Sequence, residues 1–377
     1  MASQGTLAID NLLAAALRGE APAWLDGAES GQAVDRILYH GIAGLIAERA
    51  TLLADWPSEV MSAVRHQAIA QAMWEIRHKQ LLTRLLDAFA KADITVLLLK
   101  GSALAYDLYP APASRSRGDS DILIAAIDLE RARQILARLS FERAPEDLEE
   151  DKLALQEVWS IRGEDNLRHE IDLHWQLLNT SALAGIMEYD VCATDPLSLP
   201  KLGSNARAMG RVWTLLHTCV HRAIHITNPY FVDGVTYYGG DRLIWAKDID
   251  LLSTALSDAD WDDFASAAVS QGVAAVALNG LEFAHRTFAT AIPEAVSRQL
   301  SAVRRESAST YLLAAGQMRR SWADLLAIAG WRKKLAYASA RALPSRKFMR
   351  SKFPNMQNYP LPALHIRRMI ELVLPRP

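Results

Sequence analysis

The chain has 377 residues, half of them hydrophobic and 22% charged, with a net charge of −2. This composition is typical of a globular protein with room for two or three packed units, and it excludes a general polyanion binder. No apolar run approaches the roughly 20 residues of a membrane-spanning helix, and residues 1–18 lack the basic start of a signal peptide. Cys192 and Cys219 cannot build a disulfide framework, so nothing requires an oxidising compartment. From these observations together we expect a cytoplasmic protein that does not contact membranes.

The first part of the chain changes from helical to mixed character near residue 92. Residues 1–91 carry apolar side chains three or four apart, which predicts helices. A compact apolar run at 94–99 predicts a buried strand, and a second run at 121–125 predicts another. An amphipathic pattern then predicts a helix at 129–139.

Two apolar segments at 153–161 and 168–177 flank residues 162–166, an arrangement that is typical of a β-hairpin. Helical patterns return from residue 206 and are interrupted by an aromatic, turn-rich loop at 228–240. We therefore expect an α+β protein with a mixed-sheet core between helical regions. The expected units are an N-terminal helical region at 1–91, a core at 92–200 and a C-terminal helical region with a basic tail at 201–377.

The tail is strongly basic. Residues 318–377 contain thirteen Lys or Arg, but only Asp324 and Glu371 as acids. Such a charge asymmetry can mark an anionic partner, including RNA. We favour the alternative interpretation, in which the tail docks on the acidic surface of the protein itself or is simply solvated.

Acidic side chains alternate at the start of the second predicted strand. Asp119 and Asp121 are two residues apart, so on a strand both project from the same face. Adjacent carboxylates repel each other unless a cation lies between them, and Mg²⁺ or Mn²⁺ suits such oxygen ligands together with phosphate and water. On a later strand Glu170, Asp172 and His174 share one face and offer a third acid. The alternative is that the first two acids belong to a turn that enters the strand.

A glycine and a serine follow the first predicted strand. Gly101 allows a phosphate to approach the backbone, and Ser102 at a helix start offers a hydroxyl and nearby N–H donors. Lys100, Arg115 and Arg117 are candidates for neutralising phosphate charge, since fork-shaped guanidinium donors in particular match phosphate oxygens. Of these we favour Arg115, and a structural role is the alternative for Lys100.

These segments together resemble the nucleotidyltransferase superfamily of polymerase-β type. Its pattern is an apolar strand, Gly-Ser, a spacer and Asp-x-Asp, with a third acid on a later strand. Ser120 departs from it, because the superfamily usually has an apolar residue there, and we expect an effect on packing rather than lost activity. The following segments are also similar to a bacterial group of uncharacterised nucleotidyltransferases: Leu99-Lys100-Gly101, Tyr109-Pro110, Arg115, Ile171-Asp172-Leu173-His174-Trp175, residues 242–249, Leu343-Pro344-Ser345 and Met349-Arg350.

The resemblance implies metal-dependent transfer of a nucleoside monophosphate from an NTP such as ATP to an acceptor hydroxyl or phosphate, with release of pyrophosphate. It leaves the acceptor open among small molecules, peptides and proteins. Asp119 and Asp121 would coordinate two metal ions, Mg²⁺ or Mn²⁺, and Asp172 would ligate the catalytic ion and help to deprotonate the acceptor. Gly101 and Ser102 would hold the triphosphate. The alternatives are a non-catalytic nucleotide-binding module of the same fold and an RNA-modifying nucleotidyltransferase.

A later helix carries three histidines on one face, His217, His221 and His225, at a spacing of four residues. Histidines at this spacing can bind zinc. No cysteine or acid completes such a site at suitable spacing. We therefore favour a polar stripe that lines the substrate cleft or pairs with Asp248 or Asp250.

Further candidates for the cleft surround Trp245. Arg242 and Asp248 are within two helical turns of each other. They would either contact a nucleobase or the acceptor, or form an ion pair between helices beside a core tryptophan, which is the interpretation that we favour. His174 joins the cleft candidates because it shares a strand face with Asp172.

Overall fold

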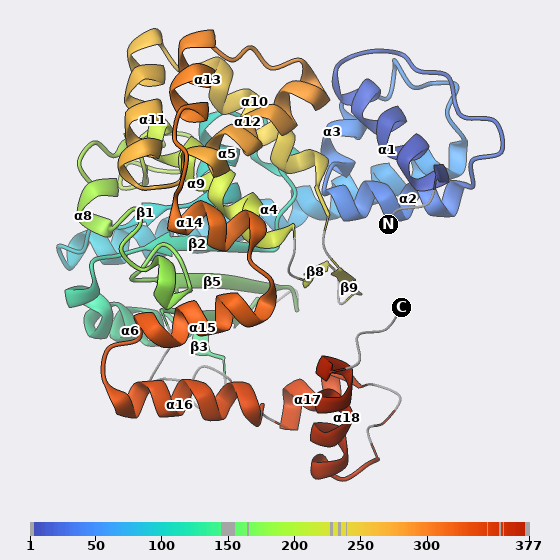
Figure 1. The fold of residues 1–377 in the computed structure, drawn as a ribbon. Helices are drawn as coiled ribbons and strands as arrows, with labels where there is room; N and C mark the ends of the chain where they lie inside the picture. Colours follow the sequence, from blue (N-terminus) through green and yellow to red (C-terminus); the bar gives the residue numbers. More distant parts are fainter. Residues whose placement is uncertain are drawn as a thin grey trace.

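The structure is a computed structural model that describes residues 4–144, 155–163, 166–226, 229–232, 235–238, 240–344, 346–353, 356 and 358–373. A mixed sheet lies among helices that come from both ends of the chain (Figure 1). The predicted α+β class with helical flanks is therefore confirmed. No helix within these ranges is long and apolar enough to cross a membrane.

The N-terminal region consists of helices α1 (Gln4–Leu17), α2 (Ser30–His40), α3 (Ala43–Ala47) and α4 (Ser58–Lys91). The last of these runs toward the sheet, and its C-terminal half buries Leu82, Leu86 and Phe89 against it. Burying a side chain of this size contributes about 1.5–3 kcal/mol. This packing fixes α4 as one wall of the region that the predicted site occupies.

Seven described strands form the sheet: β1 (Leu97–Leu98), β2 (Asp119–Leu123), β3 (Glu142–Arg143), β4 (Gln156–Arg162), β5 (Arg168–His174), β6 (Leu197–Ser198) and β7 (Arg207–Ala208). Their order is β3-β4-β5-β2-β1-β7-β6. Strand β2 is parallel to β5 and antiparallel to β1. The antiparallel pair β4 and β5 confirms the predicted hairpin.

Several boundaries differ from the sequence-based prediction. Strand β1 covers only Leu97 and Leu98 of the predicted 94–99, and helix α5 (Lys100–Asp107) begins directly after Leu99. Strand β2 begins at Asp119 rather than at residue 121, so both aspartates lie in the sheet and not in a turn. The turn interpretation was therefore wrong.

The end of the sheet also differs from prediction, since β7 lies beyond residue 200 and shortens the helix predicted from 206. That helix is α9 (Arg211–His225). The segment predicted as a loop at 228–240 contains a two-stranded hairpin of β8 (Pro229–Val232) and β9 (Val235–Tyr238), and residues 227, 228, 233, 234 and 239 lie outside the described ranges.

Shorter helices connect the strands, and longer helices follow them. The helix predicted at 129–139 is present as α6. The connecting elements are η1 (Pro112–Ser114), η2 (Ala126–Asp128), α6 (Leu129–Arg138), η3 (Ser181–Leu183) and α8 (Tyr189–Cys192). The later helices are α10 (Leu243–Ala255), α11 (Asp258–Ser270), α12 (Ala274–Phe288), α13 (Glu294–Ser301), α14 (Ser307–Ser309) and the π-helical turn η4 (Thr310–Ala314).

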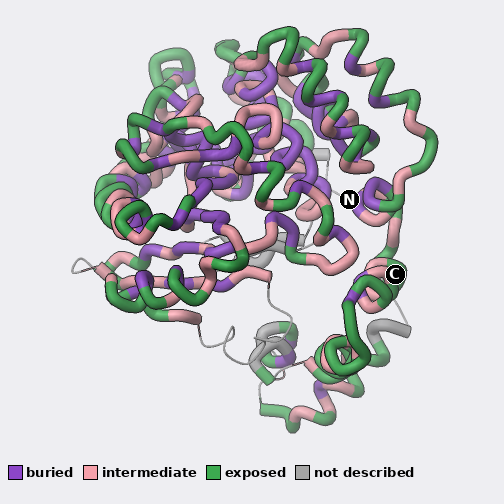
Figure 2. Tube along the Cα trace, turned by 90° about the vertical axis from the view of Figure 1, so that its left-hand side faces the viewer, coloured by how far each residue is buried: buried purple, intermediate pink, exposed green. Residues whose placement is uncertain are grey.

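Side chains of the central strands alternate between two hydrophobic cores, because successive residues of a strand point to opposite faces. Leu97 and Leu99 belong to a core that they share with helices α1, α9, α10 and α12. Leu98 and Ile122 belong to a second core with the C-terminal half of α4 and with α6. Figure 2 shows buried residues concentrated around the sheet and these helices. The sheet is thus held rigidly from both faces.

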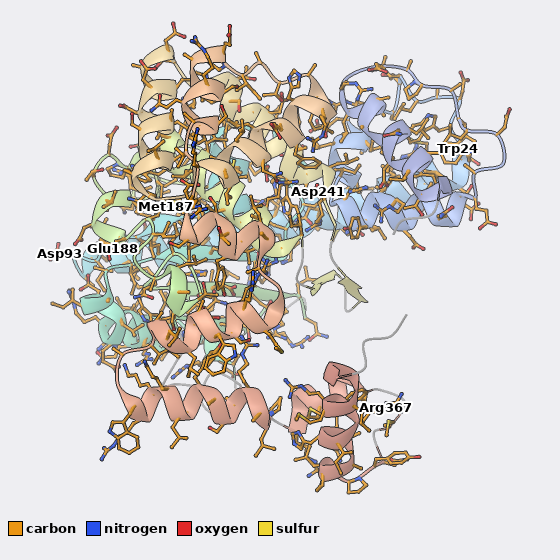
Figure 3. All side chains as sticks on the ribbon, in the orientation of Figure 1. Trp24, Asp93, Met187, Glu188, Asp241 and Arg367 are labelled. Atoms are coloured by element: carbon orange, nitrogen blue, oxygen red, sulfur yellow. The ribbon has the colours of Figure 1, made fainter. Side chains whose placement is uncertain are left out.

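The basic tail forms helices α15 (Gln317–Ala327), α16 (Trp331–Ala342), α17 (Arg346–Lys352) and α18 (Leu361–Val373). They lie on the opposite side of the sheet from α10 and α12, and Arg367 on α18 is far from Trp24 in the N-terminal region (Figures 1 and 3). Asp324 on α15 accepts hydrogen bonds from Tyr311 and Tyr337 at 3.0 and 3.2 Å, which ties α16 to the rest of the chain.

Candidate active site

Acidic side chains of neighbouring strands meet on one face of the sheet. In the parallel pair of β2 and β5, Asp121 lies opposite Asp172 and Asp119 lies opposite Glu170. This register places four carboxylates along one wall of a cavity of about 590 Å³. Asp121 is 6% exposed, whereas Asp119 and Asp172 are half-buried. The alternation predicted from the sequence therefore brings the three aspartates together.

Lys100 and His174 both contact Asp121. The Nζ of Lys100 donates a hydrogen bond to Asp121 Oδ1 at 2.6 Å, and the Nε2 of His174 lies 3.0 Å from the same oxygen. Lys100 adopts a left-handed backbone conformation with φ 50° at the start of α5, an arrangement that only a minority of non-glycine residues adopt. Its ammonium group is thereby held beside the carboxylates and not at the surface as a structural lysine would be.

Crowding of these acids changes their protonation. Burial raises the pKa of Asp119 to about 6, with a further contribution from the Asp121 carboxylate. Burial, together with the Asp121 and Asp119 carboxylates, raises the pKa of Asp172 to about 8. Burial acts in the same direction at Asp121, but Lys100 and His174 hold its pKa below the usual range. Burial and mutual repulsion thus disfavour the charged forms of Asp119 and Asp172, and a cation beside them would favour those forms.

One group within the described residues could hold a metal ion. One atom each of Asp121, Asp172 and His174 lie within 4.8 Å of one another. A donor set that is rich in carboxylate suits a hard divalent cation, and such a cation would relieve the repulsion among the acids. The residues present therefore fit a metal ion. Asp119 lies outside this group, and its predicted role as a ligand stays a prediction, whereas His174 had been predicted only for the cleft.

Arg115, the favoured phosphate-binding cation, is engaged by Asp248. Its Nε and Nη2 donate to the Asp248 carboxylate at 2.9 and 2.7 Å, and its Nη1 donates to the carbonyl of Ser116 at 2.7 Å. Tyr109 donates a further hydrogen bond to Asp248 at 2.7 Å. The ion pair thus joins α10 to the segment before β2. It contains Asp248, as expected for an interhelix pair, but its cation is Arg115 and not Arg242.

Arg117 is bound by helix α4 in the same manner. Its Nη2 lies 2.6 Å from Glu75 Oε2, and the hydroxyl of Tyr106 donates to the same carboxylate. Gln71 donates to the carbonyl of Arg117 at 3.1 Å. Sequence reasoning missed these α4 residues. The available signal was the spacing of Gln71, Glu75 and His78, which places three polar side chains on one face of the helix.

Ser102 and Ser120 lie behind the strand that carries the aspartates. Their hydroxyls are 2.8 Å apart, and Ser120 Oγ is 2.6 Å from Nε2 of His78. Both serines are buried, and Ser120 faces away from the cavity as expected. Gly101 lines the cavity, but the hydroxyl of Ser102 is engaged by Ser120. Triphosphate binding by either residue stays a prediction.

Helices α9 and α10 form the wall opposite the acids. His221 and His225 line the cavity with Trp245 and Arg242, whereas His217 is buried beneath them. Burial, with a contribution from Lys100, lowers the pKa of His217 to about 3 and that of His225 to about 4. The candidate metal group in the described residues includes none of these histidines.

Asp248 and Asp250 on α10 are engaged by side chains other than the histidines. Asp250 accepts hydrogen bonds from Lys247 at 2.9 Å and Thr290 at 2.8 Å, and Asp248 is engaged by Arg115 and Tyr109. Of the histidine stripe, His221 and His225 therefore line the cavity beside Trp245, with ring centroids of His221 and Trp245 6.0 Å apart. Arg242 instead donates to the carbonyl of Tyr39 at 2.6 Å.

A family model described as an uncharacterised nucleotidyltransferase matches residues 27–289 of this chain. The matched region includes the three aspartates, Lys100 and the wall formed by α9 and α10, and it ends before the basic tail. No curated protein matches the chain.

Proposed function

The chain belongs to the uncharacterised nucleotidyltransferase family, and we propose that it transfers a nucleoside monophosphate from an NTP to an acceptor hydroxyl or phosphate, releasing pyrophosphate. One observation carries this proposal: Asp119, Asp121 and Asp172 share one wall of a cavity, where burial and mutual repulsion raise the pKa of Asp119 and of Asp172. A structural cluster would pair such acids fully, whereas a phosphoryl-transfer site needs acids that await a cation.

We propose Mg²⁺ or Mn²⁺ as the ion, held by Asp121 and Asp172, with His174 beside them and Asp119 at the cavity edge. When bound, such an ion neutralises phosphate charge and acidifies the acceptor hydroxyl. Asp172 accepts the proton of that hydroxyl. The convergence of Asp121, Asp172 and His174 and the raised pKa of Asp172 support these roles.

Around the acids, the cavity has surfaces suited to the two substrates. Its volume of about 590 Å³ is within the range of sites for small molecules. Gly101 and Lys100 lie beside the carboxylates, where the triphosphate would bind, and Arg115 and Arg117 line the same side. Trp245, His221, His225 and Arg242 offer flat rings and a guanidinium group for the nucleobase or the acceptor.

Incubation with each NTP and Mg²⁺ in host lysate, followed by mass analysis, tests this function. We expect a new nucleotidyl adduct on one class of molecule and a matching release of pyrophosphate. The double variant Asp119→Asn, Asp121→Asn should yield neither. Pyrophosphate release by this variant at the rate of the unmodified protein would contradict the proposal, and NTP binding without turnover on any acceptor would favour a non-catalytic module.

A further inference from the structure

The position of Lys100 bears on how many metal ions the site takes. Its Nζ is 2.6 Å from Asp121 Oδ1, and it also interacts electrostatically with Asp119 and Asp172. The ammonium group therefore contacts Asp121, one of the three carboxylates that the resemblance assigns to two metal ions, on the strand face that also carries Asp119. Its side chain is 23% exposed, so it is in the cavity wall and not in open solvent.

The backbone holds Lys100 in this place. The amide of Leu99 donates to the carbonyl of Asp121 at 3.0 Å, so the residue before Lys100 is in the sheet beside Asp121. The left-handed conformation of Lys100 then turns the chain directly into α5. Because both neighbours are anchored in regular structure, the lysine stem begins within reach of the carboxylates whatever the ligand state.

Formal charge favours one divalent ion beside this lysine. Glu170 pairs with Arg168 at 2.6 Å, which leaves the three aspartates as the acids to be balanced. In the protein without nucleotide, Lys100 supplies one positive charge and a divalent cation supplies two, which together equal the three carboxylates. The candidate metal group in the described residues also fits a single ion, since Asp121, Asp172 and His174 converge without Asp119.

We propose that the Lys100 ammonium occupies one of the two cation positions, so that this nucleotidyltransferase binds a single divalent ion at Asp121, Asp172 and His174. The inference rests on the proposed function but concerns metal number and not the reaction. In this position Lys100 bridges the carboxylates and the triphosphate, as the second metal ion does in a two-metal site.

Binding of Mn²⁺ measured by electron paramagnetic resonance tests this inference. The samples contain the full chain with non-hydrolysable α,β-methylene analogues of the four common NTPs, one at a time. Two ions in one site would lie about 3.5–4 Å apart and show spin coupling. We expect one uncoupled Mn²⁺ in the unmodified protein, and a coupled pair in Lys100→Met, where the vacated position accepts a second ion. Lys100→Arg keeps the charge and should retain one ion.

Lys247→Met is the matched control, because Lys247 is also a half-buried lysine that pairs with an aspartate, Asp250, at 2.9 Å. It should bind one uncoupled ion. A coupled pair in the unmodified protein overturns the inference even if Lys100→Met does not fold, and a single ion in folded Lys100→Met overturns it as well. Neither result touches the proposed reaction, which pyrophosphate release tests separately, whereas the absence of any bound Mn²⁺ would contradict both.

Discussion

Two sets of buried acids in this protein differ in how they are balanced. On the helices, Glu75 and Asp248 each have one arginine and one tyrosine: Arg117 with Tyr106, and Arg115 with Tyr109. On the strands, Lys100 and His174 both contact Asp121, and Asp119 and Asp172 interact with Lys100 only electrostatically. Each helical acid therefore has its own counter-charge and its own hydrogen-bond donor. The strand acids at the cavity have fewer such partners, and this difference separates the acids that we propose for the chemistry from those that hold the structure together.

The largest expected effect comes from neutralising a strand acid. Asp172→Asn should lower turnover by roughly a thousandfold or more, because lost charge stabilisation amounts to several kcal/mol. The same change should raise the free energy of unfolding in EDTA, since Asp172 is repelled by its neighbours. Pyrophosphate release and urea unfolding measure the two effects. Reduced stability in EDTA would show that the acid is structural after all.

A helical acid should respond in the opposite way. Asp248→Asn leaves the Arg115 guanidinium buried without its counter-charge, so we expect a loss of about 3–5 kcal/mol in the free energy of unfolding. Urea unfolding measures this loss.

The double variant Asp248→Leu, Arg115→Met removes both charges and should recover most of that stability, because replacing a whole buried pair is often neutral. A destabilised double variant would mean that packing around the pair, and not the unpaired charge, dominates. Asp250→Asn on the same helix, whose partner Lys247 is closer to solvent, serves as the control.

The comparison also predicts a pH dependence in EDTA. The folded protein holds the pKa of Asp119 at about 6 and that of Asp172 at about 8, above the ordinary value of 3.8. The buried histidines, whose pKa values in the folded protein lie below the ordinary 6.5, act in the opposite direction at lower pH. Between about pH 7 and pH 8 they are mostly neutral in both states, while Asp172 still binds more protons in the folded state, so the free energy of unfolding should fall as pH rises across this range. Urea titrations across this range measure the slope.

A divalent cation favours the charged carboxylates, so Mg²⁺ at saturating concentration should flatten this slope. Asp172→Asn should remove most of it in EDTA, whereas Glu75→Gln should leave it unchanged in sign. A slope that rises over the same range would mean that the strand acids already have enough cationic partners, and the contrast with the helical acids would be lost.

The strand half of this comparison could be predicted from the sequence. The alternation of Asp119 and Asp121, and of Asp172 and His174, fixes which face each side chain takes once the segments are strands. The hairpin and the shared sheet then bring the three acids together, and the register of β2 and β5 places Asp121 opposite Asp172. Local periodicity carries this information, and for that reason the α+β class and the helical flanks were also predicted.

The helical half could not be predicted in the same way. Glu75 meets Arg117 only because α4 packs across the core, and Asp248 meets Arg115 across an even longer stretch of chain. Nothing in the local pattern selects these partners, so Arg115 was predicted as a free phosphate ligand and Arg242 as the partner of Asp248. The length of β1 was overestimated for a similar reason, since an apolar run at 94–99 predicts burial but not which of its residues pair with a neighbouring strand.

The smallest expected effect is at Ser120, which lies on the same strand as Asp119 and Asp121 but contacts helix α4. Its hydroxyl joins Ser102 and His78 behind the strand, while its neighbours Asp119 and Asp121 face the cavity. Ser120→Ala leaves buried polar groups of Ser102 and His78 with one partner fewer, which should cost about 1–3 kcal/mol. Turnover per folded molecule should stay within a few-fold, because no group in the cavity changes. A loss of turnover comparable to that of Asp172→Asn, with stability unchanged, would extend the chemistry to the rear of β2.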